Sequence, residues 1–417
     1  MLLLSRRFAP LFWCQFFSAF NDNFLRTTLV FFILFGRDQA DTSLITLASA
    51  VFISPYFFLS ALGGEIADRY DKARVAQRLK LAEIAVAAVA ISGFATQSIA
   101  VLFVALFGFG VIAALFGPIK YGILPDHLPR EKLPAGNALI EGATFIAILS
   151  GTIVGGLAAK DGGEPTWLSV MILGFALVCW LSSLAIPPTG SGAPGLVIQA
   201  NIAASTMQLI RTTRADARLW WGALVTSWFW LIGIVMLALL PPLVKDATGG
   251  NEETVTVYLV LFSIAVGGGS ALAALIARGR IVLNTTLAGA VLLAIFALDL
   301  GLAGLTAVPP TAAAGPADVF ATPLGLRLAV DLAALAAAGG LYIVPVFSAV
   351  QVWAGPEFRA RVIAAVNLVN AAAMTGATIA VAVLQKAGVT LPVLLLMLGA
   401  AGLVIAAAIW RTMPKAR

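Results

Sequence analysis

Long apolar segments separated by short polar ones run along the whole of this 417-residue chain. Because a helix needs about 20 residues to cross a bilayer, the pattern predicts twelve membrane-spanning helices. The predicted spans lie near residues 8–36, 42–67, 78–96, 99–121, 133–158, 166–186, 217–244, 254–277, 281–304, 325–352, 360–385 and 389–411. The first is unusual, because Asn21, Asp22, Asn23 and Arg26 lie near its middle. Ionisable groups at that depth cost about 3 kcal/mol each and usually face a partner or a water-filled path.

The longest polar segment, residues 187–216, divides the predicted helices into six and six. It opens with Pro-Pro-Thr-Gly-Ser-Gly-Ala-Pro-Gly, a density of proline and glycine that cannot continue a helix. We therefore expect an all-α polytopic membrane protein with an N-terminal six-helix bundle over residues 1–186, a cytoplasmic linker over 187–216 and a C-terminal six-helix bundle over 217–417. Two related bundles are typical of transporters whose substrate site lies at their interface.

Composition and charge exclude a soluble domain and set the orientation. The chain is 60% hydrophobic and 11% charged, whereas soluble domains are about 25% charged. Of the 26 Lys and Arg residues, twenty, including Lys80, lie at the ends of spans or between them on the side that holds both termini, and two, Arg26 and Arg327, lie well inside spans. The four on the opposite side are Arg37, Lys160, Lys245 and Lys386. This bias predicts cytoplasmic termini, and it indicates topology rather than a nucleic-acid partner.

The chain lacks the residue sets that catalysis or metal binding needs. It has one histidine, His127, and two cysteines, Cys14 and Cys179, both within apolar segments. Neither a phosphate-binding loop nor a Ser-His-Asp set is found. We expect no enzyme, no catalytic residue, no metal and no cofactor. The apolar run after residue 7 is too long for a cleavable signal, so the first helix is expected to be retained.

Residues 64–74, Gly-Glu-Ile-Ala-Asp-Arg-Tyr-Asp-Lys-Ala-Arg, join the second and third spans. They resemble the loop signature of the major facilitator superfamily, in which a glycine lets helices approach and an Asp with following Arg or Lys residues holds one state of a gate. The signature's second glycine is here Asp71. A stop-transfer cluster is the alternative interpretation. The gate residues that the resemblance implies are Gly64, Asp68, Arg69, Lys72 and Arg74.

Three further segments narrow the resemblance: residues 15–23 (Gln-Phe-Phe-Ser-Ala-Phe-Asn-Asp-Asn), 116–125 (Phe-Gly-Pro-Ile-Lys-Tyr-Gly-Ile-Leu-Pro) and 136–145 (Gly-Asn-Ala-Leu-Ile-Glu-Gly-Ala-Thr-Phe). Together they resemble the bacterial lysophospholipid transporter family of that superfamily. The resemblance implies a flippase that moves lyso-phospholipids such as lysophosphatidylethanolamine and lysophosphatidylglycerol across the inner membrane to the cytoplasmic leaflet by alternating access. Separate acyltransferase or acyl-activating enzymes would then reacylate them, since the chain ends soon after the twelfth span. We expect a monomer in the bilayer.

The first span suits such a cargo. At about 100° per residue, Gln15, Ser18, Asp22 and Arg26 share one face; beside it lies an apolar rib of Phe12, Phe16 and Phe20. A lysolipid needs cations near its phosphate, a carboxylate near its amine and an apolar slot for one chain. Arg26 and Lys120 could serve the phosphate, and Asp22 and Glu141 the ammonium. Alternatively, Asp22 and Arg26 form a structural pair, and Lys120 is an anchor at the cytoplasmic end of its span.

Other candidate residues also have a purely structural explanation. Asn21 and Asn23 complete the substrate-binding set with Asn367 and Asn370 of the eleventh span, although such amides also hold neighbouring helices together. Arg327 and Asp331 have the spacing of a structural or gate pair. A proton-coupled drug or small-solute antiporter is the rival function, because residues 151–156 are similar to a Gly-Pro-X-X-Gly motif of drug antiporters and Asp22 or Glu141 could carry a proton.

Overall fold

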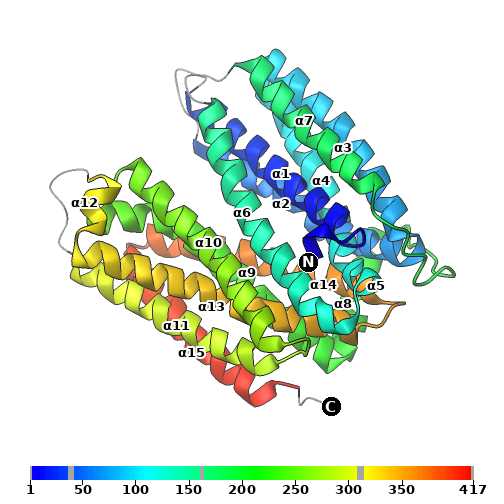
Figure 1. Ribbon diagram of the computed structural model, residues 1–417. Helices are drawn as coiled ribbons and strands as arrows, with labels where there is room; N and C mark the ends of the chain where they lie inside the picture. The colour runs from blue at the N-terminus through cyan, green and yellow to red at the C-terminus, as the bar shows by residue number, and fades with distance from the viewer. Residues whose placement is uncertain (1, 36–41, 160–163, 308–313, 415–417) are drawn as a thin grey trace. The chain divides into compact units, whose positions relative to one another are not determined.

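A computed structural model describes residues 2–35, 42–159, 164–307 and 314–414. In these ranges every regular element is a helix, and no strand is present. The twelve helices of 20 residues or more are α1 (Ala9–Phe35), α2 (Thr42–Arg69), α3 (Lys72–Ala95), α4 (Ile99–Gly122), α6 (Leu133–Ala159), α7 (Pro165–Leu184), α9 (Ala217–Thr248), α10 (Glu252–Ala277), α11 (Leu283–Thr306), α13 (Pro323–Trp353), α14 (Arg359–Lys386) and α15 (Leu391–Thr412) (Figure 1). The short helices are η1 (Leu2–Leu4), α5 (Leu124–His127), η2 (Arg130–Lys132), α8 (Ile202–Ala215) and α12 (Pro316–Phe320). The predicted all-α polytopic fold is confirmed.

Ten of the twelve long helices in the described ranges are long and apolar enough to cross a membrane. The other two, α1 and α3, carry buried polar residues, among them Asn21 on α1 and the charged pair Lys80 and Glu83 on α3. Of the four cations predicted on the external side, Arg37 and Lys160 lie outside the described residues.

The chain forms two compact units. The first comprises Met1–Gly136, Ile146–Trp220 and Val350–Ala371, and the second comprises Asn137–Phe145, Trp221–Ala349 and Ala372–Arg417. Helices α6, α9, α13 and α14 thus each contribute residues to both units. The predicted division of the sequence into residues 1–186, 187–216 and 217–417 stays a prediction.

In the first unit α3 packs against α4 and α7, and α1 packs against α7 and α4 (Figure 1). Two glycines of α6 permit a close approach to α1: a Cβ on Gly155 would lie 2.8 Å from the carbonyl oxygen of Phe24, and one on Gly151 would collide with the carbonyl of Phe20. Small residues let membrane helices approach in this way. Packing therefore explains the glycines that are similar to the antiporter motif.

The apolar rib predicted on α1 is part of this core. Phe12 and Phe20 are buried, and Phe16 is half-buried. The ring centroid of Phe20 lies 4.4 Å from that of Phe175 on α7. Aromatic rings at this separation stabilise a helix contact. The rib is thus a packed contact between α1 and α7 at Phe20, and an apolar slot for an acyl chain stays a prediction.

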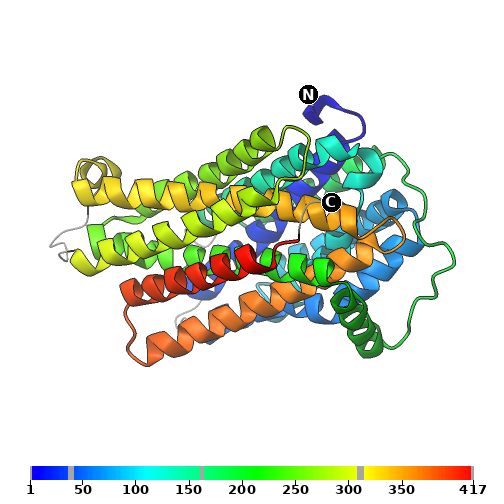
Figure 2. The same ribbon diagram turned by 90° about the horizontal axis from the view of Figure 1, so that it is seen from below.

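Helix α8 differs from the long helices of the first unit. It is short, packs against α2, and lies at a steep angle to the long helices (Figure 2). Asn201 caps its start, because the side-chain oxygen of Asn201 accepts a hydrogen bond from the Ala204 amide at 3.0 Å. The segment that joins α7 to α8 is irregular and passes along the end of α2.

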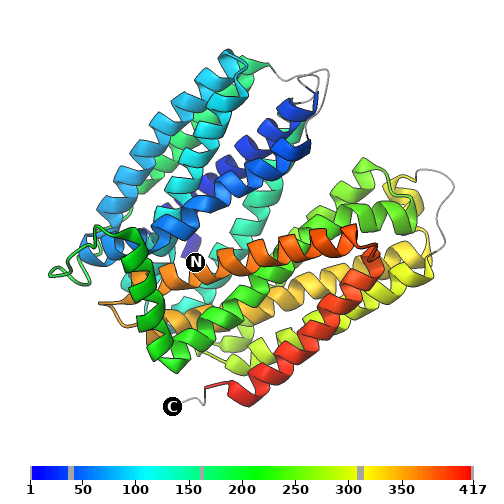
Figure 3. The ribbon, with the colours of Figure 1, turned by 180° about the vertical axis from the view of Figure 1, so that it is seen from behind.

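In the second unit α11 packs along α15, which is seen clearly from behind (Figure 3). Gly340 of α13 lies directly against the backbone of α10 at Ser270, so any side chain at this position would collide with that backbone. The hydroxyl of Tyr342, also on α13, donates a hydrogen bond of 2.7 Å to the Val225 carbonyl of α9. Helix α13 is therefore fixed against two neighbours inside its unit.

Candidate functional site

A buried ion pair lies inside the first unit, on α3. The ammonium of Lys80 is 2.6 Å from a carboxylate oxygen of Glu83, and both side chains are 0% exposed. Lys80 also donates a hydrogen bond of 2.6 Å to the hydroxyl of Ser18 on α1, and its nitrogen lies 4.2 Å from the centroid of the Phe116 ring on α4. One side chain thus links three helices, and the ion pair has the low-dielectric surroundings in which unpaired charge is most costly.

Lys80, which the sequence places among the cytoplasmic cations, is fully buried inside the first unit. The hydropathy pattern starts the third span at residue 78, which places Lys80 at its end. In the structure α3 begins at Lys72, so Lys80 lies ~12 Å along the helix at 1.5 Å per residue. The spacing of Glu83, three residues later within an apolar segment, is the signal that could have identified this pair.

Asp22 is the half-buried acidic group of α1. The charges that act on its carboxylate are those of Glu83, Lys80, Lys120 and Arg26, from α3, α4 and α1. The hydroxyl of Tyr56 on α2 also lies within electrostatic range of Asp22. Four helices therefore place charged or polar groups around Asp22, although Lys80, Glu83 and Tyr56 were not among the residues predicted from the sequence.

Arg26 is held by its own helix. Its guanidinium donates a hydrogen bond of 3.1 Å to the side-chain oxygen of Asn23, and the Asn23 amide donates one of 2.8 Å to the Ala19 carbonyl. In the ranges that the structure describes, no ion pair within 4 Å joins Arg26 to Asp22, although each charge acts on the other; the alternative of a structural pair stays a prediction. Asp22 and Arg26 thus lie on one helix, within electrostatic range of each other.

The remaining candidates of α1 and α4 differ in their surroundings. Asn21 is fully buried and donates a hydrogen bond of 3.2 Å to the Ile172 carbonyl on α7, which is a helix contact. Gln15 is also buried. Lys120 is half-buried in the last turn of α4, with its ammonium 4.7 Å from the Tyr121 ring centroid. Their roles in binding stay predictions.

Glu141 and Asn370 are buried, and Asn367 is half-buried. Glu141 belongs to the second unit, whereas Asn367 and Asn370 belong to the first. A Cβ on Gly117 of α4 would lie 2.7 Å from the Asn367 amide nitrogen. Asn367 therefore packs directly on the backbone of α4, as expected of an amide that holds helices together.

Asp68 binds the start of α14. Its fully buried carboxylate accepts hydrogen bonds from the Ala360 amide at 2.9 Å, the Arg361 amide at 3.1 Å and the Arg361 guanidinium at 3.0 Å. An acidic group here satisfies amides that a helix start leaves unpaired and suits the positive end of the helix dipole. Gly64 permits the contact, because a Cβ there would lie 2.8 Å from the Arg361 Cα.

A second ionic contact lies beside the first. Asp126 of α5 lies 3.0 Å from the Lys72 ammonium and 2.6 Å from the Arg359 guanidinium. Arg69 and Arg74, also predicted as gate residues, form no ion pair in the described ranges. The ionic network instead includes Arg359, Arg361 and Asp126, which were not among the residues predicted from the sequence.

The predicted pair of Arg327 and Asp331 is present in the second unit, at 3.9 Å. Arg327 makes shorter contacts with Asp299 of α11, through two nitrogens. Arg327 is exposed, and Asp331 is mostly buried. The expected local pair is therefore part of a three-residue group that ties α13 to α11.

Together these features define a polytopic helical membrane protein that carries buried charges in its first unit. The sequence model of the Major Facilitator Superfamily matches residues 11–333. The chain belongs to the Major Facilitator Superfamily, as its loop signature indicates.

The chain is similar to the lysophospholipid transporter LplT of Yersinia pestis (strain Pestoides F), with 32% identity over 277 residues, 64% of this chain and 65% of that protein. The LplT protein of Yersinia pseudotuberculosis serotype O:3 (strain YPIII) gives the same values. The chain thus matches just under two thirds of the length of these relatives.

Two solved structures are similar in fold. The human organic anion transporter MFSD10 (TETRAN) has a TM-score of 0.74 at 17% identity, with 96% of this chain and 98% of that chain covered. An outward-facing bacterial homologue of the iron transporter ferroportin has a TM-score of 0.74 at 14% identity, with 98% of both chains covered. At these identities the likeness shows the fold alone.

Proposed function

We propose that this protein is a lysophospholipid flippase. It moves lyso-phospholipids such as lysophosphatidylethanolamine and lysophosphatidylglycerol across the inner membrane to the cytoplasmic leaflet by alternating access, with both termini in the cytoplasm. The observation that carries the proposal is the set of opposite charges around Asp22 inside an apolar unit. The similarity to the Yersinia lysophospholipid transporters supports the same cargo.

The charges suit a headgroup that carries both signs. Lys80 and Glu83 neutralise each other and are sealed from solvent, so their role is to fix α1 through Ser18. Asp22, Arg26 and Lys120 are half-buried, and we assign these three groups to the cargo. In this assignment Arg26 and Lys120 meet the phosphate, and Asp22 meets the ammonium of lysophosphatidylethanolamine. Glu141 is assigned to the ammonium from the resemblance.

Competition binding tests the cargo class. Labelled lysophosphatidylethanolamine is displaced from the purified protein by unlabelled lysophosphatidylethanolamine, by diacyl phosphatidylethanolamine or by glycerophosphoethanolamine. We expect the single-chain lipid to compete at least about tenfold better than the other two, a difference of about 1.4 kcal/mol. The chain-free headgroup loses the burial of the acyl chain, which contributes about 0.8 kcal/mol per CH₂. Equal competition by either of the other two would exclude a lysolipid-specific site.

In the proposed cycle, Asp68 latches α14 and so stabilises the state closed to the cytoplasm. Asp68→Asn should shift the population toward the cytoplasm-open state, because an amide nitrogen cannot accept from Arg361. The shift is measured by labelling single cysteines at the cytoplasmic ends of α4 and α13. Glu357→Gln is a matched control, since the Glu357 side chain is exposed near Arg361. Accessibility equal to that of the control would argue against a latch.

The proposed setting follows from the cargo. The protein acts as a monomer in the bilayer of the bacterial inner membrane. Its lipid product is an acyl acceptor, so separate acyltransferase or acyl-activating enzymes consume it. Neither nucleic acid nor a cofactor takes part in the proposed cycle.

A further inference from the structure

The segment between α7 and α8 is fixed to the loop between α2 and α3, although its composition predicts an irregular chain. We call residues 187–199 the linker strap. The amides of Thr189 and Gly190 donate hydrogen bonds of 2.9 and 2.7 Å to the same carboxylate oxygen of Asp71. In return, the Lys72 amide donates one of 3.1 Å to the Thr189 hydroxyl. Asp71 is the residue that departs from the superfamily signature, and here it binds the strap.

Backbone contacts continue along the strap. The Ala193 amide donates a hydrogen bond of 2.8 Å to the Asp68 carbonyl, and the Ser191 hydroxyl donates one of 2.6 Å to the Arg69 carbonyl. Gly192 lies against the Pro356 carbonyl, in the loop between α13 and α14, so closely that a side chain could not fit. The strap therefore touches both segments that the Asp68 carboxylate joins.

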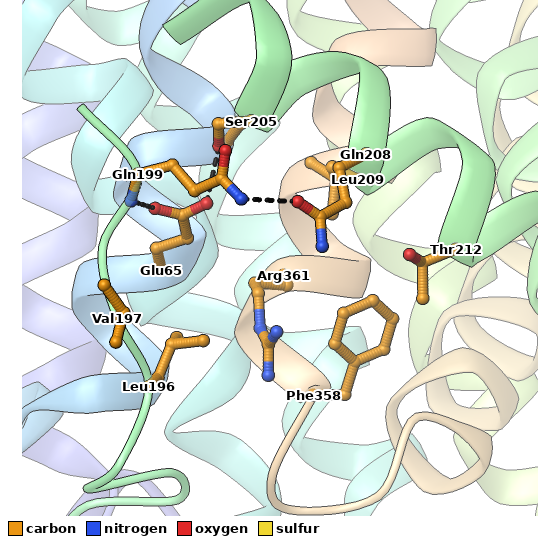
Figure 4. Close-up of a pocket in the computed structure, with 11 residues that line it drawn as sticks. Glu65, Leu196, Val197, Gln199, Ser205, Gln208, Leu209, Thr212, Phe358 and Arg361 are labelled. Atoms are coloured by element: carbon orange, nitrogen blue, oxygen red, sulfur yellow. Dashed lines mark hydrogen bonds between the residues drawn. The ribbon is translucent and has the colours of Figure 1, made fainter. Parts of the chain in front are cut away.

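Glu65 of α2 fixes the end of the strap and the start of α8. One carboxylate oxygen of this buried residue accepts a hydrogen bond of 3.0 Å from the Gln199 amide, and the other accepts one of 2.6 Å from the Ser205 hydroxyl. These bonds surround a pocket of about 230 Å³ between the strap, α8 and the start of α14 (Figure 4). Charge-assisted hydrogen bonds of this kind are about twice as strong as neutral ones.

Helix α8 also packs between α2 and α14. The buried side chain of Leu209 forms a small apolar cluster with Ala61 of α2 and with Ala364 and Ala365 of α14, and Phe358 packs against it. Leu209 and Arg361 lie on the same pocket (Figure 4). Helix α8 is thus in contact with both of the helices that the Asp68 latch connects.

We infer that the linker strap and α8 form a clasp that holds the ends of α2 and α14 together and so stabilises the latched state of the gate. Glu65 and Asp71 are its polar attachments, and Leu209 is its apolar one. A flexible tether between two bundles would be solvated, whereas this segment donates hydrogen bonds to the buried carboxylate of Glu65 on α2 and carries a buried leucine. The inference deepens the proposed transport cycle and rests on it for the meaning of the gate.

The test measures opening at a site that the clasp residues do not touch. The reporter is Ala360→Cys, at a fully buried position under the latch, in a background with Cys14→Ala and Cys179→Ala. The isosteric double variant Glu65→Gln/Asp71→Asn replaces attachment oxygens by amide nitrogens. Asn at position 71 can still accept from the Arg74 amide and thus keep the cap on α3. We expect the reporter to react about tenfold faster with a membrane-impermeant maleimide.

The matched control is Glu131→Gln, an isosteric loss of an exposed carboxylate in the same unit. It should leave the labelling rate unchanged. If the double variant does not fold, Leu209→Ala, which removes only the apolar attachment, should also accelerate labelling. A rate equal to that of Glu131→Gln in the folded variants would overturn the clasp. The labelling rate is measured without lipid, so the result for the clasp does not depend on the identity of the cargo. If the protein did not transport lysolipids, the labelling rates would still decide whether the clasp stabilises the latched state.

Discussion

Replacing Lys80 by methionine should strongly destabilise the protein. The substitution leaves the Glu83 carboxylate fully buried without its counter-charge and removes the hydrogen bond to Ser18 on α1. Removing one partner of a buried ion pair costs about 3–5 kcal/mol, most of it from the uncompensated charge. Unfolding in detergent, followed by tryptophan fluorescence against denaturant, measures the change.

The double variant Lys80→Met/Glu83→Leu should recover most of that loss, because apolar groups of similar volume often replace a buried pair at little cost. Lys132→Met, on an exposed residue of η2, controls for the removal of a lysine. A Lys80 variant as stable as the Lys132 variant would contradict the structure's placement of this pair. So would a double variant no better than the single one.

The second large effect is on transport. Asp22→Asn should leave folding nearly intact, because Asp22 is half-buried and its conservative replacement removes no ion pair that the described residues make. A hydrogen bond to a charged group contributes about 1.5–3 kcal/mol. Loss of the carboxylate charge should therefore lower the rate of lysolipid transport by about tenfold to 100-fold. The rate is measured in vesicles at equal amounts of folded protein.

Asp246→Asn serves as the control for this variant, because Asp246 is an exposed carboxylate at the end of α9. It should transport at the wild-type rate. If Asp22→Asn also kept the wild-type rate, Asp22 would have no part in moving the cargo. The proposal that α1 binds the lipid headgroup through Asp22 would then be wrong.

The twelve long helices could be predicted from the sequence because hydropathy over about 20 residues is a strong local signal. The depth of a charged residue near the end of a predicted span was predicted less reliably. Lys80 lies two residues after Arg78, so in the sequence it resembles part of a cytoplasmic cluster of cations. Helix α3 begins at Lys72, however, and this places Lys80 inside the unit. The depth of a charged residue depends on where its helix begins, which hydropathy defines poorly.

The residues that bind Asp68 and Asp126 could not be predicted from the sequence, for a different reason. Asp68 and Arg361 are 293 residues apart, and Asp126 and Arg359 are 233 apart. No local spacing links such residues, since tertiary packing alone brings them together. Asp71 shows the same limit: its departure from the signature was visible in the sequence, but its two hydrogen bonds to the linker strap were not.

The phenylalanines of α1 illustrate an ambiguity of periodicity. Phe12, Phe16 and Phe20 have the spacing of one helix face, and that spacing fits an open apolar slot and a packed helix contact equally well. The structure decides for packing at Phe20, whose ring meets Phe175.

The most direct test of the account is transport by the purified protein in vesicles, with labelled lysophosphatidylethanolamine, lysophosphatidylglycerol, diacyl phosphatidylethanolamine and a cationic drug followed in parallel. Each is measured with and without a proton gradient. The account predicts that both lysolipids cross without a gradient and faster than the diacyl lipid, and that the drug does not move. Gradient-dependent movement of the drug, with no lysolipid transport, would contradict the account and favour a proton-coupled antiporter.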